Sequence, residues 1–381
     1  ILTWAGDVGV DVRMIGDTQQ LGSVAAGNAY PRQVAQLDGV KLRNNNRQTR
    51  AHDRDAVARL QVGGAVGALA GYAQHGQLNV AMTDPERLTQ LVNGWARDAA
   101  RYADPLDRAT AVAILAVRRD RVDQLNTAAR SQARVNGWLG TDITYRRPGG
   151  EVVAYAVGDP ILLRKNDYHR PAGEPTLRNN TLWVVQAIDP NTRAMTVGRR
   201  AGRTVDHATL DAAYVASNTA HGYATTTHAA QGRTVDHAHV VPDGADPNAL
   251  LVQASRHRRG LTFYLDGGGL VDTRDQWWQL ARLPAAACAR WAADRLAGQV
   301  GLFDDERQQQ RPDTITAYDA LRRPTPKPAT TPATPVLPGA GQPTAEQRAQ
   351  AERSLARRRW QSRRPTSDVP RDGGRGIGRS C

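Results

Sequence analysis

The stretch Met14–Leu21, MIGDTQQL, runs apolar residues directly into a Gly-Asp turn and a pair of glutamines. Val12, Met14 and Ile15 are typical of the end of a short buried strand in a parallel sheet. Open α/β sheets bind their ligands at the carboxyl ends of their strands, and Gln20 follows at that position. Its neutral amide can donate to a phosphate oxygen and hold a water molecule. An ordinary strand followed by a polar turn has the same pattern, so this stretch alone leaves both interpretations open.

Three later segments follow this stretch in order along the chain. They are Leu42–Gln48 (LRNNNRQ), Tyr223–Gly232 (YATTTHAAQG) and Leu251–Arg258 (LVQASRHR), the last directly ahead of an apolar strand at 261–265. As an ordered set they resemble the later motifs of the RecD-like DNA helicases of superfamily one. They are most similar to the C-terminal helicase part of conjugative relaxases of the TraA/TraI type. The resemblance covers most of residues 1 to about 265, and it implies ATP-driven movement along single-stranded DNA with 5′-to-3′ polarity.

The resemblance implies a catalytic role for three side chains. Arg47 and Arg256 would reach across a cleft toward the terminal phosphate of ATP, and Gln20 would sense that phosphate from a first domain. A guanidinium fork suits this task because it binds phosphate oxygens in pairs and stays charged at any working pH. The competing interpretation for either arginine is a solvent-facing side chain in an arginine-rich protein.

Four further residues are expected near the nucleotide. Asp17 would orient its turn rather than hold magnesium, and Arg258 would lie close to Arg256. Gln231 and Gly232 would lie beside the phosphates, where a glycine permits a close backbone approach. ATP and Mg²⁺ are the expected cofactors.

Two residues are expected to contact the backbone of single-stranded DNA. Thr226 and His228 would donate to it from a hydroxyl and an imidazole. Ala229 stands where many relatives carry a lysine, so part of that contact is missing. His228 could instead satisfy a hydrogen bond in the core. Trp183 could stack on a base, but a position in a core is favoured.

The phosphate-binding half of such a motor is not in this sequence. A Gly-rich loop should end in Gly-Lys-Ser/Thr, but none of the three lysines, Lys41, Lys165 and Lys327, has a glycine before it. The only Asp-Glu step, Asp305–Glu306, lies in a polar stretch rather than at the end of a strand. We therefore expect an N-terminally truncated fragment that does not hydrolyse ATP alone. Most Mg²⁺ ligands would lie upstream of Ile1, on a strand ending in Asp-Glu within about 20 residues.

Composition narrows the choice of partners. The 381 residues include 50 Lys and Arg against 37 Asp and Glu, a formal charge of +13. This excess of positive charge favours a polyanionic partner, unless it reflects genome bias.

Cys288 and Cys381 are the only cysteines, so a disulfide framework or a cysteine zinc site is excluded. His237 and His239 flank one residue without a third ligand, so no metal site is expected. With no apolar run near the roughly 20 residues of a membrane span, a cytoplasmic protein without membrane contact is expected.

The pattern of elements predicts an α/β fold. It should contain a RecA-like motor domain, a parallel sheet flanked by helices, with an inserted small SH3-like β-barrel that the resemblance implies and a disordered C-terminal tail. An apolar run at 111–115 and a helical pattern at 121–134 support the sheet, while short β-rich pieces at 151–215 support the insert. The expected domains are a remnant of a first RecA-like domain (1–24), a second RecA-like domain (25–145 and 216–270), the insert (146–215), C-terminal helices (271–305) and a disordered basic tail (306–381).

Two alternative functions remain at this point. One is a module that grips single-stranded DNA without hydrolysis, derived from a decayed helicase fold. Decay should first erase Gln20, Arg47 and Arg256, which only hydrolysis needs, and all three are present. The other is a RecD-like recombination exonuclease subunit, which shares every motif. The upstream part of the same polypeptide, a motor domain with or without a relaxase domain, would distinguish it from a transfer protein.

Overall fold

The computed structural model describes residues 7–17, 30, 34, 45–171, 173–270, 276, 279, 282–284 and 286–300. All of them lie within the unit Ile1–Ala317 that the internal contacts of the chain define. The predicted phosphate sensor Gln20 and the predicted disordered tail at 306–381 lie outside the described residues.

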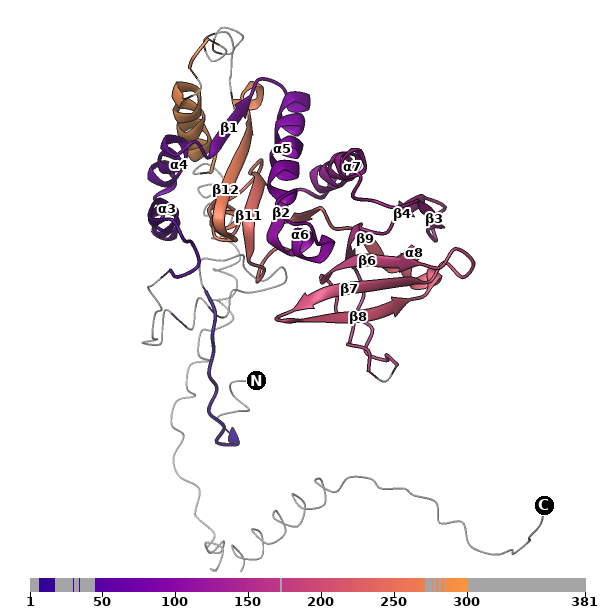
Figure 1. Ribbon diagram of the computed structural model, residues 1–381. Helices are drawn as coiled ribbons and strands as arrows, with labels where there is room; N and C mark the ends of the chain where they lie inside the picture. Colours follow the sequence, from indigo (N-terminus) through magenta and orange to yellow (C-terminus); the bar gives the residue numbers. More distant parts are fainter. Residues whose placement is uncertain are drawn as a thin grey trace, which may run out of the picture. The chain divides into compact units, whose positions relative to one another are not determined.

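A five-stranded parallel sheet forms the centre of this unit, with strand order β1-β12-β11-β2-β10 (Figure 1). In chain order the strands are β1 (Leu78–Ala81), β2 (Val112–Ala116), β10 (Ala224–Thr226), β11 (Val235–Val241) and β12 (His257–Asp266). All five residues of β2 are buried, as expected for a central strand covered on both faces. The predicted parallel sheet is confirmed.

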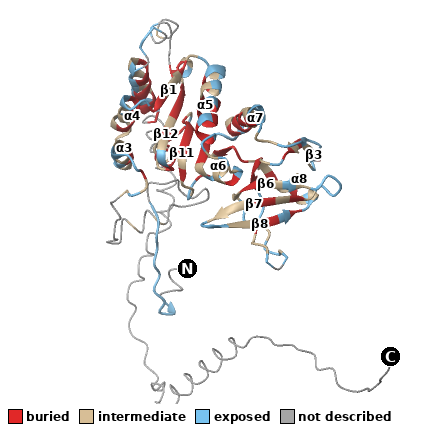
Figure 2. Cartoon of the chain, viewed as in Figure 1, coloured by how far each residue is buried: buried red, intermediate tan, exposed pale blue. Residues whose placement is uncertain are grey.

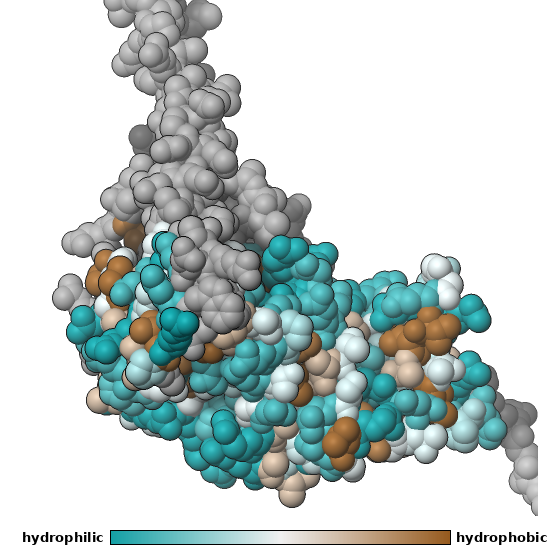
Figure 3. All heavy atoms as spheres, turned by 90° about the horizontal axis from the view of Figure 1, so that it is seen from above, coloured by the Kyte–Doolittle hydropathy of each residue, from teal (hydrophilic) through white to brown (hydrophobic). Residues whose placement is uncertain are grey.

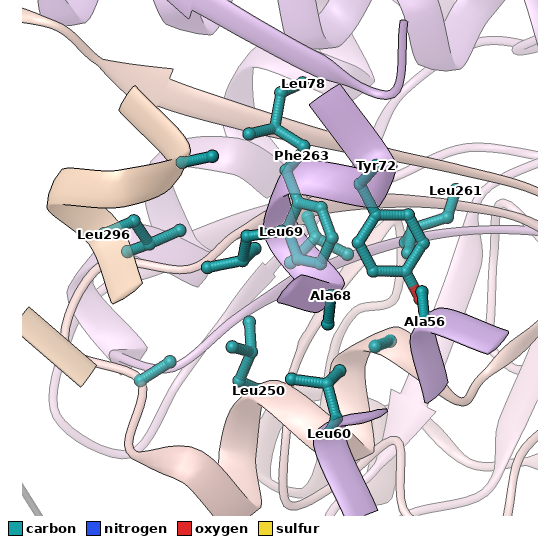
Figure 4. Close-up of a cluster of buried hydrophobic side chains, with 14 of the residues drawn as sticks. Ala56, Leu60, Ala68, Leu69, Tyr72, Leu78, Leu250, Leu261, Phe263 and Leu296 are labelled. Carbon is teal, nitrogen blue, oxygen red and sulfur yellow. The ribbon is translucent and has the colours of Figure 1, made fainter. Parts of the chain in front are cut away.

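Helices cover both faces of this sheet (Figures 1 and 2). They are α3 (Ala51–Gln61), α4 (Ala65–Gln74), α5 (Asp84–Ala99), α6 (Pro105–Ala111), α7 (Arg119–Val135) and α9 (Pro247–Ala254), with a short 3₁₀ turn η1 (Gly268–Leu270). One apolar core joins the sheet to α3, α4, α9 and the helical residues 286–300, and a second joins it to α5 and α7. In the first core Leu69 and Tyr72 of α4 pack beside Phe263 of β12 (Figure 4). Burial on both faces gives the RecA-like arrangement predicted from the sequence.

Single residues set the ends of these helices. Helices α3 and α4 are separate because Gly63 between them adopts φ +80°, a conformation that glycine tolerates and a helix does not. Val66, early in α4, is 59% exposed. Helix α5 is capped by Thr83, whose hydroxyl accepts from the Glu86 amide.

An antiparallel region is inserted between α7 and β10. It consists of β3 (Ile143–Arg146), β4 (Val152–Tyr155), β5 (Pro160–Leu163), β6 (Leu182–Ile188), β7 (Met195–Ala201), β8 (Thr204–Leu210), α8 (Ala212–Asn218) and β9 (Thr219–His221). Strands β3 and β4 pair as a hairpin, and the other five form a sheet of order β8-β7-β6-β5-β9. Trp183 is fully buried in its core, so the core interpretation is confirmed and base stacking by Trp183 is wrong. The SH3-like identity of this insert stays a prediction.

The strand expected at Val12–Ile15 is not present. Residues 10–17 have no regular structure, and Val12, Met14 and Ile15 are 44%, 37% and 98% exposed. A buried strand needs neighbours for its backbone groups and for both faces. No strand in the described part of the chain pairs with this segment.

The surface is mostly hydrophilic, as expected for a chain in which 23% of the residues are charged. On the face seen in Figure 3, hydrophilic side chains predominate and apolar ones form small separate patches. None of the helices in the described ranges is both long enough and apolar enough to cross a membrane.

A buried carboxylate ties the insert to the parallel sheet. Asp159, directly before β5, has no exposed surface and accepts from Arg130 of α7 at 2.9–3.1 Å. It also accepts from the Tyr223 hydroxyl at 2.6 Å, just before β10, and from the Ala156 amide at 2.7 Å. One side chain therefore joins α7, the start of β10 and the insert.

Replacing this carboxylate is expected to destabilise the protein strongly. Asp159→Asn removes one of the two carboxylates that pair with Arg130 and leaves Asp142 as the other. The free energy of unfolding, measured in urea titrations, should fall by about 3 kcal/mol. The control is Asp206→Asn, which breaks the pair with Arg199, whose two side chains are 28% and 27% exposed, and should cost less than about 1 kcal/mol. Equal losses in the two variants would show that Asp159 is not the link between the two regions.

Candidate nucleotide and nucleic-acid site

Two segments more than 200 residues apart lie side by side where β12 begins. Arg47 donates from Nη1 to the Ser255 carbonyl at 2.6 Å, a separation of 208 residues. Gln48, which is buried, donates from Nε2 to the His257 carbonyl at 2.9 Å. Burial lowers the pKa of Arg47, and the nearby charge of Arg258 lowers it further. The structure thus brings the second and fourth sequence segments together.

Arg256 occupies the turn between α9 and β12. Its guanidinium donates to the Val252 carbonyl at 3.0 Å, to the Ser255 hydroxyl at 2.7 Å and to the Arg233 carbonyl at 3.4 Å. Burial, followed by the charge of Arg47, lowers the pKa of Arg256 to about 10, while Asp17 acts in the opposite direction. Arg256 is therefore close enough to Arg47 and to Asp17 for each of them to act on it electrostatically. A guanidinium has five N–H donors, so these bonds within the described chain leave two for a ligand.

These arginines lie at the edge of the sheet where its strands begin, called here the amino edge. Strands β11 and β12 are parallel with Val235 opposite His257, so Arg233 and Arg256 precede neighbouring strand starts. Arg258 is half-exposed, with Nη1 3.6 Å from an oxygen of Asp236. The amino edge thus carries several guanidinium groups, an arrangement that attracts phosphate.

A buried pair beneath the arginines was not predicted from the sequence. His257 Nε2 lies 3.3 Å from Asp53 Oδ2 with both side chains fully buried, and Gln77 donates to Asp53 Oδ1 at 2.8 Å. Burial would raise the pKa of Asp53, but the hydrogen bonds from His257 and Gln77 outweigh it and lower the pKa. A signal was available, because Asp53 falls on the same helical face as the apolar Ala56 and Leu60. The pair anchors α3 to the first residue of β12.

The Tyr223–Gly232 segment is bound to the same turn through α9. Gln253, which has no exposed surface, donates from Nε2 to the Thr227 hydroxyl at 2.9 Å. Thr227 in turn donates from its amide to the Ala116 carbonyl at the end of β2. Sequence reasoning assigned no role to Gln253, although it lies within the Leu251–Arg258 segment. It links the DNA-contacting segment expected from the sequence to the arginine-bearing one.

The residues expected to face ligands in this segment lie at the surface. His228 is exposed, so the alternative that it satisfies a hydrogen bond in the core is wrong. The Thr226 hydroxyl accepts from the Ala229 amide at 3.2 Å. Gln231 and Gly232 are exposed, and Gly232 has φ +86°. Their roles at a nucleotide or at DNA stay predictions.

The two histidines of β11 point toward α5. His239 Nε2 is 3.2 Å and His237 Nδ1 is 3.6 Å from the same Asp98 oxygen. Burial lowers the pKa of both histidines, although Asp98 opposes that effect. Across the residues that the structure describes, no group of three or more His, Cys, Asp or Glu side chains is placed to hold a metal ion.

Comparisons with known proteins identify relatives of this chain. A family model described as an AAA domain matches residues 1–83. The conjugal transfer protein TraA of Agrobacterium fabrum (strain C58 / ATCC 33970) is 30% identical over 260 residues, which is 67% of this chain and 22% of that protein. TraA of Rhizobium radiobacter is 28% identical over 257 residues, with the same coverage. The chain is a relative of the TraA conjugal transfer proteins. It spans about a fifth of the length of these two TraA relatives.

A solved structure also aligns with the chain. The crystal structure of Bacteroides Pif1 bound to ssDNA covers 72% of this chain and 67% of that chain at 15% identity, with a TM-score of 0.40. The RecA-like assignment rests on the strand order and packing described above.

The Asp53–His257 pair generates a prediction about stability and pH. An Asp whose pKa is lowered by folding stabilises the protein above its unfolded pKa of about 3.9, and this contribution is lost as pH falls through the lower, folded pKa. Asp53→Asn should lower the free energy of unfolding by about 3 kcal/mol at pH 7. Below about pH 4, the free energy of unfolding of this variant should fall less steeply with decreasing pH than that of the wild type. If the free energy of unfolding falls with pH equally steeply in Asp53→Asn and in the wild type, the Asp53–His257 pair contributes no charge-dependent stability.

Proposed function

We propose that this chain is the second motor domain, with appended elements, of an ATP-driven DNA helicase. The complete protein would move 5′ to 3′ on single-stranded DNA as the helicase half of a conjugative relaxase. The observation that carries the proposal is the convergence of Arg47 and Arg256 at the amino edge of a parallel sheet. The relationship to TraA supports the role in conjugal transfer.

Phosphoanhydride hydrolysis depends mainly on positioning and charge stabilisation. Arg47 donates to the Ser255 carbonyl of the turn that carries Arg256, and Arg256 donates to the Val252 carbonyl of α9. With a pKa of about 10, Arg256 keeps its charge at neutral pH even though it is buried. A preorganised charge in a region of low dielectric acts more strongly on a developing negative charge than one in water. In this proposal both guanidinium groups meet the terminal phosphate of ATP.

The remaining residues act around this centre. Gln20 senses the terminal phosphate from the first domain, and Asp17 orients its turn. Gln231, Gly232 and Arg258 lie beside the nucleotide. In the same proposal, Thr226 and His228 hold the DNA backbone, and ATP with Mg²⁺ is held mostly by a first motor domain of the same polypeptide.

The chain by itself is expected to lack ATPase activity. It supplies arginines for the terminal phosphate, but no lysine in a Gly-Lys-Ser/Thr loop. Release of phosphate by the purified chain, measured with saturating oligo(dT), should not exceed that of a sample without protein. Turnover that Arg256→Ala abolishes would contradict this expectation, because the chain would then hold a complete site.

The proposed arginine role is tested in the full-length gene product. Arg256→Lys keeps the charge but loses the fork, and kcat for single-stranded-DNA-stimulated ATP hydrolysis should fall by about 10³ or more. Arg203→Lys, an exposed residue between β7 and β8, should leave kcat unchanged. Affinity for oligo(dT) should stay within about twofold of the wild type in both variants, since DNA is held elsewhere. A kcat for Arg256→Lys equal to that of Arg203→Lys would favour the non-hydrolysing binding module.

A further inference from the structure

A cavity of about 300 Å³ lies where the insert meets the parallel sheet. Helix α6, strands β6 and β7 and the turn before β11 form its walls, and α6 lies beside the insert in Figure 1. The polar residues that line it are Thr110, Asn180, Thr181, Arg199, Arg200, Arg233 and Thr234. This volume is at the lower limit for small-molecule sites, which are about 300–1,000 Å³.

The walls of this cavity are held together by charged and polar bonds. Arg200 of β7 donates to Asp104 at 2.5 Å and to Asp107 at 2.6 Å, both at the start of α6. Asn180, ahead of β6, donates to the Ala229 carbonyl at 2.9 Å. The cavity is therefore built by the fold, and one wall is bonded directly to the segment that contains Thr226 and His228.

The charges lining the cavity are not balanced. Arg199 is paired with Asp206 at 2.8 Å, and Arg200 is paired with the two carboxylates of α6. Arg233 has no carboxylate and no hydrogen-bond acceptor for its guanidinium among the residues that the structure describes. Burial alone lowers the pKa of Arg233 to about 10, so it remains charged at neutral pH. A partly buried cation without a partner is costly to keep, and an anionic ligand would remove that cost.

We propose that this cavity binds one phosphate of single-stranded DNA, with the Arg233 guanidinium as its principal ligand. The inference rests on the proposed function, because it adds a DNA contact to the same motor. A guanidinium fork matches two phosphate oxygens. The hydroxyls of Thr110 and Thr181 already donate to the carbonyls of Leu106 and Arg178, so the Arg233 guanidinium is the donor that the proposal relies on. The DNA backbone is favoured over a free nucleotide because Asn180 donates to the Ala229 carbonyl, within the segment that contains the proposed DNA contacts Thr226 and His228.

The test measures binding of fluorescein-labelled oligo(dT) to the full chain by anisotropy over a range of salt concentrations. Arg233→Met keeps the aliphatic stem but removes the charge, and it should weaken binding about tenfold. The slope of log affinity against log salt should become shallower by about 0.7, the value for one phosphate contact on a single strand. Removing an unpaired charge should not lower the thermal unfolding midpoint, so the loss of binding cannot be ascribed to misfolding.

Arg203→Met is the matched control, because it removes the same charge from an exposed turn that does not line the cavity. Its affinity should stay within about twofold of the wild type. Inorganic phosphate and ATP are titrated as competitors of the oligonucleotide. Specific displacement by either one at constant ionic strength, weakened by Arg233→Met, would assign the cavity to a free phosphate compound and overturn the DNA assignment.

The remaining outcomes separate this inference from the helicase function. Binding by Arg233→Met equal to that of the wild type overturns the cavity site but leaves the Arg256 test of hydrolysis standing. Absence of oligo(dT) binding by the wild-type chain also overturns it. A tenfold loss in Arg233→Met with an unchanged Arg203→Met supports the site, even if the full-length protein proves not to hydrolyse ATP.

Discussion

Parallel pairing of β11 with β12 is the constraint on which the rest of the structure depends. Because both strands run in the same direction with Val235 opposite His257, the residues that precede them must emerge at one edge of the sheet. Arg233 and Arg256 are such residues, and the carbonyl of the first accepts from the guanidinium of the second. Segments that the sequence separates by more than twenty residues are thus adjacent because of backbone pairing alone.

Crowding cations at this edge has an electrostatic cost that the fold offsets in part. Arg47 lowers the pKa of Arg256, and Arg258 lowers that of Arg47, so each destabilises the charged form of its neighbour. Backbone carbonyls of Val252 and Ser255 and the charge of Asp17 act in the other direction. Beneath them the buried Asp53–His257 pair fixes the turn. An edge that keeps its positive charge despite this repulsion is already organised for a polyanion such as a triphosphate.

The sequence predicts what depends on local pattern. The apolar run at 111–115 and the helical pattern at 121–134 correspond to β2 and α7. Both could be predicted, because a buried strand gives a continuous apolar run and an amphipathic helix gives apolar residues with a period of 3.6. The segment Val12–Ile15 carries the pattern of a buried strand but has no strand partner in the described chain, and pattern alone cannot supply one. Gln253, Asp159 and Arg233 could not be found, because their importance depends on neighbours 26 or more residues away or on a cavity made by separate elements.

Arg233 connects the two proposed sites through one residue. Its backbone carbonyl accepts from the arginine proposed to meet ATP, and its side chain lines the cavity proposed to hold DNA. A shift of Arg256 toward a phosphate would weaken the 3.4 Å bond to that carbonyl and so free the turn that carries the DNA ligand. If the two sites influence each other in this way, linkage requires the effect to be reciprocal: DNA in the cavity must change the affinity for nucleotide by the same factor. The coupling needed by a motor would then depend on one peptide unit at the amino edge of the sheet.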